Sequence, residues 1–152
     1  MYVAKALLQP HGQWLMDAAT SLSARPSAAA ADNRCPSCGG PPQLSILSAV
    51  SDSGDGGRHL QCAHCLTLWS FRRVTCPNCG EEDERQLGYF HSQAFDHVRV
   101  DACDSCRRYL KSVDLERLGL AVPLVDEVAA ASLDAWACEH GYEKIELNLL
   151  GF

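Results

Sequence analysis

Eight of the nine cysteines in this 152-residue chain fall into four Cys-x-x-Cys pairs. The pairs are Cys35/Cys38, Cys62/Cys65, Cys76/Cys79 and Cys103/Cys106. A Cys-x-x-Cys pair places two sulfurs on one tight turn, and two such turns supply the four thiolates of a tetrahedral zinc or single-iron centre. The sequence therefore predicts two metal ions, each held by four cysteines.

The spacing of the pairs indicates a tandem duplication of one unit. A shift of 41 positions places the first four cysteines on the last four, and it also places Gly39 on Gly80 and Arg58 on Arg99. Because 23 residues separate the two pairs in each unit, we expect each unit to form its own site. The first site would hold Cys35, Cys38, Cys62 and Cys65, and the second would hold Cys76, Cys79, Cys103 and Cys106. A cross-braced arrangement, in which the first pair shares a metal with the third, is the alternative.

We expect the metal to hold each unit folded. A unit of about 40 residues buries little apolar surface, whereas structural zinc adds roughly 10–16 kcal/mol of apparent binding free energy in small peptides. Two other roles for the thiols stay open, namely redox or metal sensing and catalysis by a thiol–disulfide oxidoreductase. The chain has no glycine-rich phosphate loop and no nucleophile elbow, so we expect that the protein is not an enzyme.

Basic residues follow several of the cysteine turns. They are Arg72, Arg73, Arg107, Arg108 and Lys111. Their simplest role is to offset the negative charge of the thiolates, and contact with a partner is the second role. A zinc-ribbon module that binds nucleic acid is an alternative function, but the formal net charge of −6 opposes contact with a polyanion.

The composition is that of a globular protein, with 47% hydrophobic and 21% charged residues. No apolar run approaches the ~18 residues of a membrane-spanning helix, so we expect no membrane insertion. The N-terminal residues lack the unbroken apolar stretch of a secretory signal. We therefore expect the chain in the cytoplasm, where thiols stay reduced.

Helices are expected to flank the cysteine units, which gives a small, metal-stabilised α+β fold. Apolar residues recur at near-helical spacing over 1–22, where Pro10 is expected to kink the helix or to start a second one. A second helix is expected over 125–140, followed by a short strand or tail over 144–150. Strand-like runs bounded by turn signals span residues 44–50, 58–61, 66–74, 86–90, 98–102 and 109–113. The predicted divisions are 1–33 (helix and linker), 34–74 (first ribbon), 75–113 (second ribbon) and 114–152 (spacer and C-terminal helix).

The motifs resemble the formate dehydrogenase accessory protein family (FdhE type). The likeness is carried by Cys35-Pro-Ser-Cys-Gly-Gly-Pro-Pro, Gly57-Arg-His-Leu-Gln-Cys-Ala-His-Cys65, Trp69, Arg73, Cys76-Pro-Asn-Cys-Gly80, Cys103-Asp-Ser-Cys-Arg-Arg-Tyr-Leu-Lys111, Asp126, Leu133-Asp134, Gly141-Tyr142 and Asn148. It covers residues 34–152, and Ala6-Leu-Leu-Gln-Pro10 resembles the end of the family's helical domain.

The resemblance implies a function that the spacing alone does not. Such proteins are cytoplasmic maturation factors that bind the catalytic subunit of respiratory formate dehydrogenase before its export. Their cysteine pairs form two rubredoxin-like centres, so the resemblance implies that the eight paired cysteines are the ligands. Iron is the expected metal, with zinc as the alternative.

The chain departs from the family in length. Full members are longer and begin with a helical domain, of which this chain matches only the last helix. The apolar stripe of Leu7, Trp14 and Leu15 is then left without its partner. This predicts weak self-association through the N-terminal helix, or docking onto a separate helical partner.

Overall fold

The computed structural model describes residues 2–20, 33–48 and 57–151. The predicted linker over 23–33 and the turn signals over 51–57 lie almost wholly outside the described residues. Along the chain the elements are α1 (Tyr2–Thr20), β1 (Pro42–Ser48), β2 (Gly57–Cys62), β3 (Leu68–Phe71), the 3-10 turn η1 (Glu84–Gln86), β4 (Leu87–Ser92), β5 (Phe95–Cys103), β6 (Arg108–Asp114), α2 (Pro123–Ala129), α3 (Ala131–Glu139) and β7 (Glu143–Lys144). This mixture of helices and one sheet confirms the predicted α+β class.

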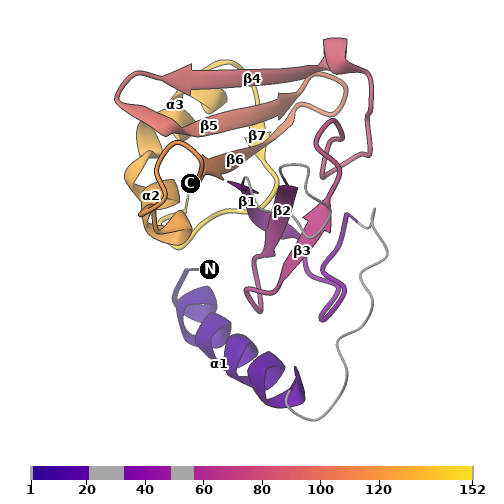
Figure 1. Ribbon diagram of the computed structural model, residues 1–152, viewed down its shortest axis with the longest axis vertical. Coiled ribbons are helices and arrows are strands. Elements are labelled where there is room, and N and C mark those ends of the chain that lie inside the picture. The colour runs from indigo at the N-terminus through magenta and orange to yellow at the C-terminus, as the bar shows by residue number, and fades with distance from the viewer. Residues whose placement is uncertain (1, 21–32, 49–56, 152) are drawn as a thin grey trace.

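One mixed sheet joins the two cysteine units. In the first unit β2 pairs antiparallel with β1 and β3, and in the second unit β5 pairs antiparallel with β4 and β6. The units meet where β1 runs parallel to β6, with Ser45 beside Ser112 and Leu47 beside Asp114. The strand order is β3-β2-β1-β6-β5-β4, and β7 pairs with the start of β6. Figure 1 shows the second unit at the top and the first unit between it and α1.

Each unit has its own apolar cluster. Val98 and Val100 of the second unit are fully buried in a cluster that also contains Leu133 of α3. In the first unit the cluster contains Trp69, Phe71, Leu60 and three of the cysteines together with Leu110 of β6, and Met16 of α1 packs against it. Trp69 therefore packs beside the first site, where Cys35, Cys62 and Cys65 are buried and Cys38 is exposed.

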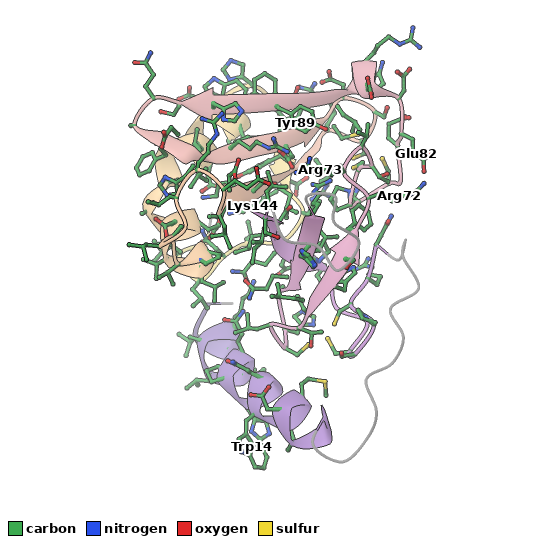
Figure 2. The ribbon with its side chains drawn as sticks, viewed as in Figure 1. Trp14, Arg72, Arg73, Glu82, Tyr89 and Lys144 are labelled. Atoms are coloured by element: carbon green, nitrogen blue, oxygen red, sulfur yellow. The ribbon has the colours of Figure 1, made fainter. Side chains whose placement is uncertain are left out.

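The N-terminal helix is continuous. Pro10 lies inside α1, so the second helix start that the sequence analysis allowed is not present. Val3, Leu7 and Trp14 are exposed, at 74%, 71% and 63%, and Figure 2 shows Trp14 pointing away from the rest of the molecule. Within the described ranges, no helix has both the length and the apolarity needed to cross a membrane.

The C-terminal helix, predicted as one element over 125–140, is divided at Ala130 into α2 and α3. The ammonium group of Lys111 donates to the backbone carbonyls of Glu127 and Ala130. In a continuous helix these two carbonyls would accept hydrogen bonds from backbone N–H groups one turn later. Here both accept hydrogen bonds from the lysine side chain. The long-range contact from β6 explains a break that the local sequence does not indicate.

Four charged side chains are buried together beneath this break. Lys111 Nζ lies 3.1 Å from Glu127 Oε1 and 2.5 Å from Asp134 Oδ2, and Lys144 Nζ contacts the same two carboxylates. The side chains of these four residues are at most 1% exposed, so two positive charges are balanced by two negative charges in the interior. The Tyr109 hydroxyl also donates to Asp134 over 2.8 Å. Burial, reinforced by this carboxylate, raises the pKa of Tyr109 far above its usual value, so the phenol remains a donor.

Removal of one charge from this network is expected to destabilise the fold. In the variant Asp134→Asn two buried ammonium groups share one carboxylate, which costs about 3–5 kcal/mol of unfolding free energy. Urea denaturation of the metal-loaded protein measures the loss. The matched control is Glu143→Gln, because the Glu143 side chain is 74% exposed and its pair with Arg108 lies at the surface; this change is expected to cost less than about 1 kcal/mol. Equal effects of the two changes would contradict the role given to the buried network.

Candidate metal centres

The first four cysteines form one cluster of sulfurs. Cys35 and Cys38 lie on the turn before β1, whereas Cys62 and Cys65 lie on the turn between β2 and β3. The Sγ atoms of Cys35 and Cys65 are 3.6 Å apart, and those of Cys38 and Cys62 are 3.4 Å apart. All four Sγ atoms lie within 4.8 Å of one another, so the antiparallel pairing of β1 with β2 brings the two turns together.

The last four cysteines repeat this arrangement around β4 and β5. The Sγ atoms of Cys76 and Cys106 are 3.7 Å apart, and those of Cys79 and Cys103 are 3.8 Å apart. These four sulfurs are also mutually within 4.8 Å. The structure thus groups the cysteines locally, unit by unit, and not in the cross-braced arrangement that was the alternative.

The backbone at the two centres repeats as closely as the sulfurs. Gly39 and Gly80 follow the first turn of each unit with positive φ values of 71° and 80°, a conformation that glycine adopts without strain. Leu66 and Arg107, which are also 41 positions apart, follow the second turn with φ values of 59° and 56°. Every Cys-x-x-Cys turn therefore ends on a left-handed residue, and only the glycines were identified from the sequence. The left-handed positions of Leu66 and Arg107 carry no signal of residue type.

The donor set fits a tetrahedral metal ion. Four sulfurs at about 2.3 Å from a central zinc are about 3.8 Å apart along each edge of the tetrahedron. The sulfur pairs measured above are 3.4–3.8 Å apart, and all pairs within a cluster lie within 4.8 Å. The same distances are much longer than a disulfide bond of about 2.05 Å. Neither cluster includes a histidine or carboxylate from the part of the chain that the structure describes, so each candidate site consists of thiols alone.

Burial favours the protonated form of several of these thiols when no metal is bound. Burial raises the pKa of Cys38 to about 11 and raises the pKa values of Cys62 and Cys76 further. At Cys65 burial acts in the same direction, but hydrogen bonds with Thr67, and also with Cys38 and Cys35, together outweigh it and lower the pKa. Metal binding must therefore release protons, and the affinity of either site for metal is expected to increase with pH.

The second centre is tied to the C-terminal segment. The Asp104 carboxylate accepts hydrogen bonds from Tyr142 at 2.7 Å and from Arg107 at 2.8 Å, and Arg107 also donates to the carbonyl of His140. The Arg107 guanidinium lies 4.1 Å from the centre of the Tyr142 ring. Ser105 donates to Glu81 over 2.7 Å and so links the two turns of this centre directly. These bonds fix the positions of Cys103 and Cys106.

The arginines related by the duplication converge between the units. Arg58 Nη2 lies 3.0 Å from Asp101 Oδ2, and Arg99 Nε lies 2.7 Å from Asp101 Oδ1. Arg58, whose side chain is 2% exposed, also donates to the carbonyl of Thr75, the residue before Cys76. A side chain of the first unit therefore positions the start of the second centre, a role that its sequence position did not indicate.

Four of the five basic residues considered as partner contacts lie at the surface. The side chains of Arg72, Arg73 and Arg107 are 50–54% exposed, and that of Arg108 is 35% exposed. Each pairs with a carboxylate of the same chain, and Figure 2 shows Arg72 beside Glu82. Lys111 differs from the expectation, because its side chain is fully buried against Glu127 and Asp134 and leaves no surface for a partner.

Loss of one cysteine is expected to remove one metal ion. Cys62→Ser and Cys103→Ser occupy equivalent positions in the two units, so each variant should retain about one metal per chain where the parent holds two. Elemental analysis of anaerobically purified protein measures this ratio. Cys138→Ser is the control, because Cys138 is exposed and lies in neither cluster. Two metal ions retained in Cys62→Ser and Cys103→Ser would contradict the assignment of these cysteines as ligands.

Comparison with known proteins places the chain in a family. Residues 34–73 match the model of the FdhE central domain, and residues 74–150 match that of the FdhE C-terminal domain. An FdhE homologue from Aquifex aeolicus is 41% identical over 79% of this chain and 42% of its own length. One from Shewanella oneidensis is 33% identical over 81% of this chain and 36% of its own.

The crystal structure of FdhE from Pseudomonas aeruginosa superposes with a TM-score of 0.77 at 29% identity, over 97% of this chain and 50% of that one. This chain spans half or less of the length of the relatives that it matches. Both cysteine clusters lie within the matched domains. The chain therefore belongs to the FdhE family.

Proposed function

We propose that the protein is a non-enzymatic accessory factor that binds the catalytic subunit of formate dehydrogenase in the cytoplasm before that subunit is exported. The main support is that both cysteine quartets lie, complete and clustered, within a chain that matches the FdhE central and C-terminal domains. Because the chain spans only part of its relatives, this role rests on the part that it shares with them.

In this proposal the two metal ions have a mainly structural role. All eight paired cysteines would bind metal, with iron expected from the family and zinc compatible with the same sulfur geometry. When bound, the ion supplies the positive charge that allows four thiolates to lie within a few ångström. The protein supplies the turns, the apolar cluster beside the first centre and the hydrogen bonds that hold the second.

A capture experiment tests the proposed partner. Anaerobically purified protein is used as bait in an extract of a formate-respiring host, next to a bait with Cys76→Ser and Cys79→Ser. The intact bait is expected to retain a formate dehydrogenase catalytic subunit, identified by mass spectrometry, and the variant is expected to lose it because the second centre no longer holds β4 to β5. Retention of RNA and ribosomal protein in place of that subunit would contradict the proposal and favour a nucleic-acid-binding module.

The exposed arginines before the second centre are the proposed contact with the partner. Arg72 and Arg73 are each about half exposed and pair with Glu82 and Glu116. The change Arg72→Ala with Arg73→Ala is expected to lower recovery of the catalytic subunit at least about fivefold, which corresponds to about 1 kcal/mol of binding free energy. Arg85→Ala is the control, because Arg85 is 85% exposed and also pairs with a neighbouring carboxylate. A similar loss for the control would assign the effect to general charge.

A further inference from the structure

A cavity of about 540 Å³ lies between α1 and the first centre. One wall is formed by Leu8 and Leu15 of α1, and the other includes Leu147 from the segment after β7. Cys38 and Cys65 of the first centre also line it. The size is within the ~300–1,000 Å³ of ligand-binding pockets, and the second centre has no comparable cavity among those found in the described residues.

Specific contacts hold α1 at the distance that creates this cavity. The side chain of Gln9, only 6% exposed in the residue as a whole, donates to the carbonyl of Ala63 over 2.9 Å. Gly12 faces the same cysteine turn, where a Cβ atom would lie 2.7 Å from the carbonyl oxygen of His64. A residue other than glycine would push α1 away from the first centre. The wall is therefore fixed by close packing and a buried hydrogen bond.

The outer face of α1 is separate from the cavity. Leu7 and Trp14, exposed at 71% and 63%, do not line it, whereas their chain neighbours Leu8 and Leu15, exposed at 65% and 44%, do. The helix thus presents two apolar faces, one towards the first centre and one towards solvent. Substitutions on the two faces can therefore be compared, Leu8 and Leu15 on the cavity side against Leu7 and Trp14 on the outer side.

The charge around the cavity is negative once the first centre holds a divalent metal. Four thiolates and a divalent ion carry a net charge of −2, and two of those sulfurs, Cys38 and Cys65, line the cavity. Lys5 and Glu146 both line the cavity and pair with each other at 3.4 Å, so together they add no net charge to it. A ligand that fits this cavity therefore has apolar groups that contact the leucine walls and basic groups that lie near the negative charge of the first centre.

From these observations we infer that the cavity binds an apolar peptide segment flanked by basic residues. The inference rests on the proposed metal at the first centre and deepens the proposed function, because such a segment would belong to the bound partner. The apolar side chains of the peptide enter between α1 and the segment after β7 that contains Leu147. The basic groups lie near the sulfurs of the first centre, whose charge favours them.

Fluorescence anisotropy with labelled synthetic peptides tests this inference on the metal-loaded protein. The probe is a short peptide of leucine and alanine preceded by two arginines, and its counterpart has two glutamates in their place. The arginine peptide is expected to bind at least about tenfold more tightly, a difference of about 1.4 kcal/mol, and to weaken as salt increases. Equal binding of the two peptides, or no binding of either, would overturn the inference.

Paired variants locate the binding site. Leu8→Ser with Leu15→Ser is expected to weaken the arginine peptide about tenfold, whereas Leu7→Ser with Trp14→Ser should change it less than about twofold. The opposite ranking would place the peptide on the outer face and overturn the inference. So would a dimer, detected by sedimentation, that the Leu8 and Leu15 changes abolish, because a second copy would then fill the cavity. Capture of formate dehydrogenase is measured separately, so failure of either proposal is distinguishable from failure of the other.

Discussion

In each of two clusters, four cysteine sulfurs must lie within 4.8 Å of one another, and the rest of the structure depends on this constraint. As thiolates they repel, and as protonated thiols they have few good hydrogen-bond partners. A cation at the centre of each cluster resolves both problems, and it does so only if two turns from different ends of a hairpin meet. The strands, the left-handed residues and the apolar cluster beside the first centre all hold the turns in place. On the proposed role of the metal, its binding and the folding of the chain are one process.

The duplication gives two centres with the same backbone and different surroundings. The turns repeat down to the positive φ values at positions 41 residues apart. The second centre is tied by Asp104 and Tyr142 to the C-terminal segment, whereas the first lies beside α1 and the cavity. One sheet, joined through parallel pairing of β1 with β6, makes the two units a single body. Two similar cysteine clusters therefore have different neighbours, the C-terminal segment at the second and α1 with the cavity at the first.

The sequence predicted the parts of this fold that local chemistry encodes. The cysteine spacing predicted which sulfurs gather, the turn signals and strand-like runs predicted most of the hairpins, and the glycines predicted two of the left-handed turns. Long-range pairing was not predictable in this way. Lys111 follows a cysteine turn and was considered a surface contact, but the ion pairs that bury it come from Glu127 and Asp134. Neither residue type nor spacing shows that a lysine in a strand will meet two carboxylates from helices. The break at Ala130 has the same origin.

X-ray absorption at the metal edge of anaerobically purified protein tests the central claim most directly. The account predicts four sulfur neighbours at about 2.3 Å from each metal ion and no nitrogen or oxygen ligand. The spectrum is read from the intact chain, so it needs neither a partner nor a variant. Nitrogen or oxygen in the first shell, or fewer than four sulfurs per metal, would contradict the claim that each cysteine quartet forms a closed site.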